Sequence, residues 1–520
     1  MRGKRGLFFM AVLISAGTIA LQVLVTAQQA GTQAEILKKG EASKPVPEPK
    51  VFVTTHSGRF GNATVAYTAA AGETYLLDDK GEPKASIFSF AYQKDGIKDP
   101  ATRPITFLWN GGPGSSSFWL HMGSMGPRRV EVPSDAKDAG PPPYKVEDNT
   151  LALLDVTDLV FVDPVGTGFS HALGRHDNKE FWGLNEDADA IAEFIRTWVT
   201  QNKRWLSPKY LLGESFGTTR AGAVAGRLEG GSPALSLNGL VLISQALDYT
   251  GSSPQPDNLI AHVTYLPTMA ATAWYHGKVK DRPASLEEFL RQARAFALDT
   301  YAPALFKGNK LDPAARGGIR QRLAYFTGLS EDYVERSDLQ VLAGRFLKEL
   351  LRSEGKTVGR LDGRYTGDDV DKAAELPDGD PSSYEIDGAY AASFSNYIAT
   401  ELGVAMDHNY RFSGGPELSG NWKWRTASEG RSWEPSYVNV SRDLSRALRR
   451  NNGLRVMVAA GYYDFATPFF DAEYTFARHG FLPERIIMHY YEAGHMMYLH
   501  RPSLEKLLAD VRAFIEGGKK

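Results

Sequence analysis

Residues 210–219 read YLLGESFGTT and place Ser215 between two glycines, directly after an apolar run. A serine nucleophile on a sharp strand-to-helix turn has this Gly-x-Ser-x-Gly pattern, because larger side chains at the glycine positions would clash in the turn. The run 209–213 predicts the strand, and TTRAGAVAGRLEG (218–230) predicts a helix of small residues that packs closely. The same pentapeptide also fits an ordinary loop serine, so the chain must also supply a base, an acid and an oxyanion site.

Further apolar runs alternate along the chain with predicted helices. Runs typical of strands buried on both faces lie at 86–92, 105–109, 159–163, 209–213, 239–244, 454–461 and 484–491. Sequence patterns predict helices over 183–201, 285–298, 338–355 and 503–516. This alternation predicts an α/β fold with a mostly parallel central sheet flanked by helices, and we expect a helical cap over it.

The chain divides by composition into five predicted segments. Residues 1–27 are a predicted signal peptide, since MRGKRG is basic and an apolar run and small residues follow it. The alternative is an uncleaved membrane anchor, because a run of this length can just span a bilayer. We expect a secreted or periplasmic protein. The remaining segments are a flexible tether (28–50), the first part of the core (51–249), the helical insertion (250–400) and the second part of the core (401–520).

The composition argues against several classes of function. The 59 Lys and Arg residues nearly balance the 61 Asp and Glu residues, and no long basic run follows the N-terminus, so we expect no nucleic-acid partner. The absence of cysteine excludes disulfides, a cysteine nucleophile and a thiolate metal site. The chain also lacks a His-Glu-x-x-His motif. We therefore expect neither a metal nor a cofactor.

Two later residues complete a candidate triad with Ser215. In such sites the chain order is serine, acid, histidine, and the acid and the histidine follow later strands. Asp464 comes three residues after the run that ends near Gly461, and His495 comes four residues after the run that ends at Tyr491. His495 would accept the serine proton, and Asp464 would orient and stabilise the imidazolium. The less well placed alternatives are Asp471, His479, His489 and His500.

The most specific feature is the glycine-rich stretch FLWNGGPGSSS at 107–117, which overlaps and follows the predicted strand 105–109. Backbone N–H groups converge on a developing alkoxide only where side chains do not intervene, and adjacent glycines meet this condition. We predict that the N–H groups of Gly112 and Phe216 form the oxyanion hole. Losing one such donor typically costs about 3 kcal/mol of transition-state stabilisation.

Taken together, these pieces resemble the serine carboxypeptidases, peptidase family S10, which have the α/β-hydrolase fold. The stretches WNGGPGSSS, VDPVGTGFS, GESFG, GYYDF and AGHMMY occur in the family order between residues 105 and 500. The resemblance implies an exported serine carboxypeptidase that acts on peptides with a free C-terminal carboxylate through an acyl-enzyme. It also implies that Asn110, Gly111 and Glu214 bind that carboxylate.

The implied carboxylate contact has a consequence for pH dependence. Glu214 must be protonated to donate a hydrogen bond to a carboxylate, whereas His495 must be neutral to act as a base. Mildly acidic pH is therefore expected to favour peptides. An esterase without the carboxylate contact would favour neutral or higher pH.

The sequence departs from the family pattern near this subsite. Eukaryotic relatives often carry a cysteine at the position of Ser115 and an acid at the position of Ser124, and FGTTRAG replaces the common YAGHYVP after the nucleophile. Arg128 or Arg129 could compensate as a cationic partner. These differences fit a bacterial-type member and leave the triad in place.

Two other functions stay open. An esterase, acyltransferase or lyase could use the same scaffold, because the fold and the triad do not fix the reaction. A non-catalytic envelope binding protein could have kept the fold, although the complete triad argues against it. In either case we expect membrane contact only if residues 1–27 remain as an anchor.

Overall fold

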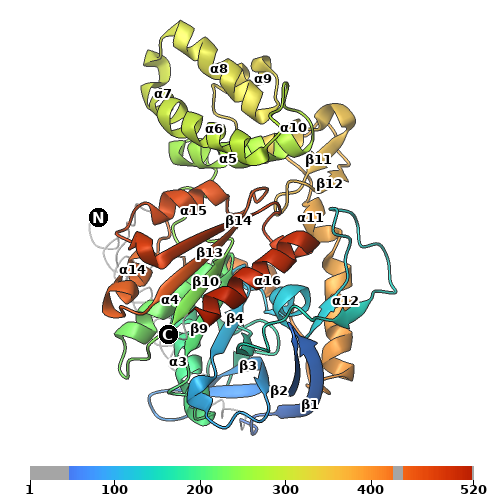
Figure 1. Cartoon of the computed structure of the whole chain (residues 1–520), viewed down its shortest axis with the longest axis vertical. Coiled ribbons are helices and arrows are strands. Elements are labelled where there is room, and N and C mark those ends of the chain that lie inside the picture. Colours follow the sequence, from blue (N-terminus) through green and yellow to red (C-terminus); the bar gives the residue numbers. More distant parts are fainter. Residues whose placement is uncertain (1–45, 425–436, 518–520) are drawn as a thin grey trace, which may run out of the picture. The chain divides into compact units, whose positions relative to one another are not determined.

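A ten-stranded mixed sheet forms the centre of the computed structural model, which describes residues 46–424 and 437–517 (Figure 1). Neighbouring strands along the sheet are β1 (Val51–Phe60), β2 (Ala63–Leu77), β3 (Pro83–Lys94), β7 (Asp158–Val162), β4 (Ile105–Trp109), β9 (Lys209–Glu214), β10 (Gly239–Ile243), β13 (Arg455–Gly461) and β14 (Ile486–Tyr491), and β8 (His171–Ala172) pairs with β3. All neighbouring pairs from β7 to β14 are parallel, whereas β1, β2, β3 and β8 form antiparallel pairs.

All seven predicted runs form strands of this sheet, so the predicted α/β fold with a parallel sheet is confirmed. The antiparallel strands β1 and β2 were not predicted. In β1, exposed side chains alternate with half-buried ones, and the strand therefore lacks a continuous apolar run. Small side chains such as those of Ala69 and Ala71 make up much of the buried face of β2.

Helices cover both faces of the parallel strands. Buried side chains of α3 (Leu184–Gln201), α4 (Phe216–Gly230) and α14 (Ser441–Arg450) share one apolar core. Those of α12 (Asp387–Thr400) and α16 (Arg501–Glu516) share a second core. The closing helix predicted over 503–516 is α16, and its apolar stripe is buried as expected.

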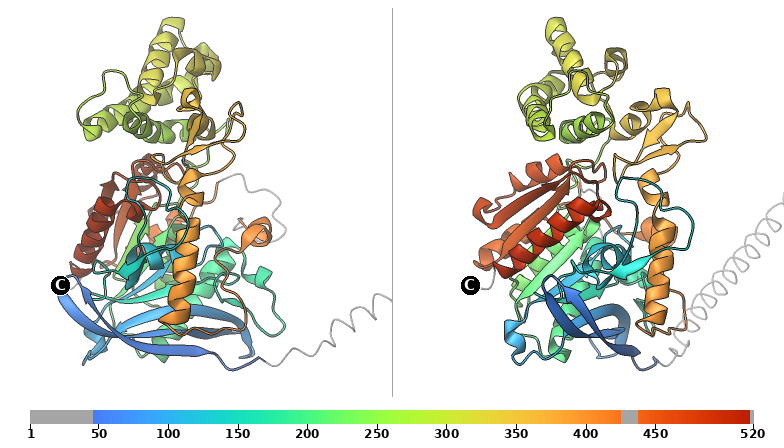
Figure 2. Two further views of the ribbon diagram at one scale, coloured as in Figure 1. Left: turned by 90° about the vertical axis from the view of Figure 1, so that its right-hand side faces the viewer. Right: turned by 45° about the vertical axis from the view of Figure 1, so that its right-hand side comes forward.

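A group of helices with its own apolar core lies above the sheet in Figure 2. Its members are α5 (Leu259–Tyr275), α6 (Leu286–Phe296), α7 (Ala302–Lys307), α8 (Pro313–Thr327), α9 (Glu331–Arg336) and α10 (Ala343–Glu349). Helix α6 begins at the predicted cap, where the Ser285 side chain accepts a hydrogen bond from the amide of Glu288.

The prediction of one helix over 338–355 is wrong, because only α10 is α-helical there. Asp338 and Leu339 have left-handed φ angles of 51° and 61°, which interrupt a helix. Gly355, with a φ of 69°, then leads into β11 (Lys356–Val358), which pairs with β12 (Thr366–Asp368).

By its internal contacts, Glu48–Lys520 forms one unit. The predicted signal peptide and most of the predicted tether lie outside the described residues. Within those residues, no helix combines the length and the apolarity that crossing a bilayer requires. The limits proposed for the core and its insertion remain predictions.

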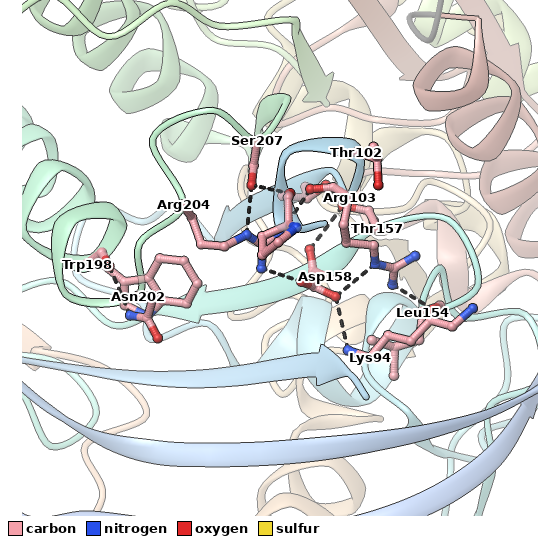
Figure 3. Close-up of polar contacts among 12 residues, drawn as sticks. Lys94, Thr102, Arg103, Leu154, Thr157, Asp158, Trp198, Asn202, Arg204 and Ser207 are labelled. Atoms are coloured by element: carbon pink, nitrogen blue, oxygen red, sulfur yellow. Dashed lines mark hydrogen bonds and ion pairs between the residues drawn. The ribbon is translucent and has the colours of Figure 1, made fainter. Parts of the chain in front are cut away.

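A buried charge network joins the amino ends of three parallel strands (Figure 3). Asp158 begins β7 and accepts hydrogen bonds from Arg103 Nε at 2.9 Å and from Arg204 Nη1 at 2.6 Å. Arg103 precedes β4, and Arg204 precedes β9. All three side chains are buried, so the network stabilises the end of the sheet opposite to the candidate site.

Candidate active site

Ser215 lies on a sharp turn between β9 and α4. Its φ of 60° and ψ of −130° are strained for a residue with a side chain. Gly213 permits the turn, because a side chain there would overlap with the carbonyl oxygen of Gly217. The Ser215 side chain is partly exposed, and among the described residues its hydroxyl makes no hydrogen bond. The hydroxyl is therefore free to face a substrate.

Asp464 and His495 form a buried pair beyond the ends of β13 and β14. The distance from His495 Nδ1 to Asp464 Oδ2 is 2.8 Å, and the carboxylate also accepts hydrogen bonds from the Ala466 amide at 2.7 Å and the Thr467 hydroxyl at 2.8 Å. Burial lowers the pKa of His495, but the charge and hydrogen bond of Asp464 outweigh it, and the net shift is upward. The competing histidines His479, His489 and His500 face Asp248, Asp510 and Ser503 instead.

Two adjacent residues at the end of β10 hold the serine and the histidine. The amide of Ser215 donates to the carbonyl oxygen of Ile243 at 3.0 Å, and the hydroxyl of Ser244 donates to the carbonyl oxygen of His495 at 2.7 Å. The backbones of Ser215 and His495 are thus held by two consecutive residues of the chain, Ile243 and Ser244. No hydrogen bond joins the side chains of Ser215 and His495. Ligands of open α/β sheets bind at these carboxyl ends of the strands.

The glycine loop after β4 lies directly against this turn. A methyl group on Gly111 would lie 2.5 Å from the amide nitrogen of Phe216, so only glycine permits the approach. Within the described part of the chain, the N–H groups of Gly112 and Phe216 donate to no acceptor. Both predicted donors are therefore available to an oxyanion.

A buried arginine of α4 supports the glycine loop. Arg220 Nη1 donates to the carbonyl oxygen of Asn110 at 2.8 Å, and its Nε donates to Asp187 Oδ2 of α3 at 2.6 Å. The ion pair with Asp187 fixes the guanidinium, which in turn fixes the peptide plane that precedes Gly111. This role of Arg220 was not predicted, although an arginine within the small-residue stretch TTRAGA at the start of the helix was a visible signal.

Asn110 and Glu214 form a hydrogen-bonded pair beside the nucleophile. Asn110 Nδ2 donates to Glu214 Oε1 at 3.1 Å, and Asn110 Oδ1 accepts from the amide of Leu120 at 3.1 Å. Burial raises the pKa of Glu214 to about 7, against the opposing effects of the His495 charge and the Tyr498 hydroxyl. The carboxyl group is therefore protonated at mildly acidic pH.

The two arginines considered as cationic partners of this pair are engaged elsewhere. Arg128 pairs with Asp148, and Arg129 pairs with Glu147. Neither arginine forms a hydrogen bond or an ion pair with Glu214 in the described structure. The carboxyl of Glu214 therefore has no arginine partner from this segment.

Residues 360–364 form a loop that binds the backbone of Gly494 and His495. The amide of His495 donates to the carbonyl oxygen of Leu361 at 2.6 Å, and the amide of Gly494 donates to Asp362 Oδ2 at 3.1 Å. Asp362 is buried and pairs with Arg364 at 2.6 Å. Asp362 could not be recognised from the sequence, because no local pattern shows which distant loop reaches the histidine.

Comparison with known proteins adds independent information on the sequence. Residues 71–251 match the family model described as serine carboxypeptidase. A segment of 167 residues is 29% identical to serine carboxypeptidase-like 16 of Arabidopsis thaliana and covers 31% of this chain and 37% of that protein. A segment of 143 residues is 33% identical to the pheromone-processing carboxypeptidase kex1 of Pyrenophora tritici-repentis and covers 27% of this chain and 20% of that protein. The matches thus span only about a third and a fifth of these relatives.

The fold also has a solved counterpart. The crystal structure of Kex1(Δ)p, a prohormone-processing carboxypeptidase from Saccharomyces cerevisiae, matches with a TM-score of 0.52 and covers 86% of this chain and 90% of that chain. The sequences are 14% identical, so this likeness shows the α/β-hydrolase fold alone. The family model and the curated relatives thus show that residues 71–251 and the matched segments are similar to serine carboxypeptidases, on a fold that the solved carboxypeptidase shares.

Proposed function

We propose that this protein is a serine carboxypeptidase that hydrolyses the C-terminal peptide bond of peptides through an acyl-enzyme. The observation that carries the proposal is the buried pair of Asn110 and Glu214, which lies beside Ser215. A triad alone would also serve an esterase, whereas a protonated carboxyl next to an amide suits the recognition of a free carboxylate.

In the proposed mechanism, the Ser215 hydroxyl oxygen attacks the carbonyl carbon of the scissile bond while His495 takes the hydroxyl proton. The N–H groups of Gly112 and Phe216 stabilise the oxyanion, and Asp464 stabilises the imidazolium. His495 then returns the proton to the leaving amino acid. Water hydrolyses the acyl ester by the same proton path in reverse, which regenerates the serine.

The proposed carboxylate-binding residues are Asn110, Gly111 and Glu214. Gly111 keeps the loop close to the nucleophile, and the other two provide hydrogen-bond donors while Glu214 is protonated. As the pH rises through the Glu214 pKa of about 7, the carboxyl ionises and repels the substrate. As the pH falls through the raised pKa of His495, the base is lost. These two opposed ionisations leave only a narrow pH window for peptide hydrolysis, just on the acidic side of the Glu214 pKa of about 7.

We also propose that the protein is exported, from the signal-like sequence of residues 1–27. Cleavage would release it to the periplasm or the medium, and retention of the segment would anchor it to the membrane. Residues 28–50 would then act as a tether.

The test compares a blocked dipeptide that has a free C-terminal carboxylate with its C-terminal amide, across mildly acidic to alkaline pH. We expect release of the free amino acid from the acid and much slower turnover of the amide. Ser215→Ala should abolish both the activity and labelling by a fluorophosphonate. Equal rates on acid and amide would favour an esterase or amidase, and an absence of labelling in the wild type would favour a binding protein.

A further inference from the structure

Two buried polar atoms close to the nucleophile lack a hydrogen bond of regular geometry. Glu214 Oε2 and Tyr498 Oη are both shielded from water, and neither has a hydrogen bond of regular geometry, although the two side chains lie close enough to interact with each other. Buried polar groups are normally paired, because an unpaired one loses its interactions with water without compensation. Two such atoms at one site indicate that a ligand completes their hydrogen bonds.

The two atoms belong to neighbouring side chains. Glu214 directly precedes Ser215, and Tyr498 lies in the short helix η8 (Met497–Leu499), three residues after His495. The Tyr498 hydroxyl is close enough to both Glu214 and Asn110 to interact with them. Burial and the nearby Glu214 hold the pKa of Tyr498 well above its usual value, so the phenol keeps its proton and remains a donor.

The packing around Tyr498 gives its hydroxyl a fixed position. A methyl group on Gly123 would lie 2.6 Å from Cδ2 and Cε2 of the Tyr498 ring, so the ring occupies space that only a glycine leaves. The next residue, Ser124, donates its hydroxyl to a backbone carbonyl of its own segment at 3.2 Å. Ser124 therefore does not serve as a partner of Glu214, whereas Tyr498 lies beside it.

The chemistry of these groups selects the class of ligand. The Asn110 amide, the protonated Glu214 carboxyl and the Tyr498 phenol each offer a donor. In the described structure, no lysine or arginine forms a hydrogen bond or an ion pair with these three side chains. A carboxylate, with one charge and two acceptor oxygens, fits such a site better than a phosphate, which calls for cationic partners.

We infer that Tyr498 is a substrate-binding residue whose hydroxyl donates to the terminal carboxylate of the peptide, beside Asn110 and Glu214. The inference rests on the proposed function and adds a determinant of specificity for the free C-terminus. Tyr498 reaches the carboxylate from the segment that also carries His495. One short stretch of chain therefore carries both the catalytic base, His495, and a residue that binds the end of the peptide, Tyr498.

The test is Tyr498→Phe, which removes the hydroxyl and keeps the ring against Gly123. We expect KM for the blocked dipeptide to rise about 10- to 100-fold at mildly acidic pH, as for the loss of one hydrogen bond to a charged group, with kcat nearly unchanged. KM for the amide and for an ester should change less than about twofold, because these substrates lack the carboxylate. A competitive inhibitor that ends in a carboxylate should weaken by the same factor as the dipeptide.

A matched control is Tyr491→Phe, since that hydroxyl is in the preceding strand and donates to Asp510 at 2.8 Å. It should leave KM for acid and amide unchanged. An equal loss on acid, amide and ester in Tyr498→Phe would overturn the inference and indicate damage to the histidine loop. The inference would also be overturned if KM at low pH were unchanged and only the pH at which KM begins to rise were shifted. Tyr498 would then act through the ionisation of Glu214 alone.

The inference and the proposed function fail in different ways. If the wild type does not discriminate acid from amide, the proposed function fails. If the wild type discriminates and Tyr498→Phe discriminates equally well, the inference alone fails.

Discussion

At the residue scale, the protonation state of Glu214 would set the sign of its interaction with the terminal carboxylate of the proposed peptide substrate. Burial raises the pKa of this carboxyl to about 7, so below that pH the group is neutral and donates a hydrogen bond. Above it, the ionised side chain would repel the carboxylate of the proposed substrate. The same burial that makes the acid costly to ionise therefore makes it useful for binding an anion.

Glu214→Gln separates this effect from the titration of His495. In the wild type, KM for the blocked dipeptide should rise up to about tenfold per pH unit above the Glu214 pKa, because one ionisation controls binding. The glutamine side chain stays a neutral donor, so its KM should be flat over the same range. A KM that still rises with pH in the variant would place the controlling group elsewhere. Ester substrates serve as the control, since their KM should be independent of pH in both proteins.

The meeting of Asp464 and His495 could be predicted because each of them, like Ser215, follows a recognisable strand by a few residues. The apolar runs locate the strand ends, and residues at the carboxyl ends of parallel strands meet at one edge of the sheet. The structure brings Asp464 and His495 into hydrogen-bond distance in this way. The role proposed for Tyr498 could not be recognised from the sequence, because it depends on a ring position set by Gly123, far away in the sequence.

At the element scale, the loop 360–364 connects the helical group to the catalytic end of the sheet. It accepts hydrogen bonds from the amides of Gly494 and His495 and thereby fixes the backbone that carries the imidazole. The ion pair of Asp362 with Arg364 is buried, so the position of the loop is itself well defined. The loop that follows the helical group therefore helps to position His495.

Asp362→Ala should therefore impair both stability and catalysis. Removing one partner of a buried ion pair typically lowers the free energy of unfolding by about 3–5 kcal/mol. Loosening of His495 should also lower kcat on peptide and ester alike, by about 10- to 100-fold, because both reactions use the same base. Urea unfolding and kinetics on both substrates measure the two effects.

Glu473→Gln provides a matched control for that variant. Glu473 of α15 (Phe469–Phe476) pairs with Arg294 of α6 at 2.7 Å and also joins the helical group to the core, without contact to the histidine loop. It should leave kcat unchanged in the folded protein. If Asp362→Ala, measured as folded protein, keeps full kcat, the loop has no positioning role.

The elements that the sequence did not predict correctly were missed for the same physical reason. Strand β1 alternates exposed and half-buried side chains and is stabilised by its pairing with β2, which no local pattern reveals. Conversely, residues 338–355 have a helical apolar pattern, but left-handed backbone at Asp338 and Leu339 delays the α-helix until α10, and the left-handed Gly355 leads into β11, which pairs with β12. In both cases tertiary contacts override local preference.

At the scale of the whole molecule, the candidate catalytic residues and a stabilising charge network lie at opposite ends of the sheet. The candidate catalytic residues lie at the carboxyl ends of the parallel strands, and the buried network of Asp158 lies at their amino ends (Figure 3). In this network one carboxylate balances the guanidinium groups of Arg103 and Arg204. Both guanidinium groups are otherwise bound by backbone carbonyls and a serine hydroxyl.

Asp158→Asn should destabilise the protein without changing the chemistry of the folded state. The substitution leaves two buried guanidinium groups without a counter-charge, and we expect a loss of about 3–5 kcal/mol in the free energy of unfolding. The measurement is the urea midpoint at unchanged slope, together with kcat/KM well below that midpoint. The exposed pair of Asp332 and Arg336 provides the control, since Asp332→Asn should cost at most about 1 kcal/mol. Similar small losses in both variants would refute a stabilising role for the network, and a fall in kcat/KM of Asp158→Asn alone would show that the two ends of the sheet are coupled.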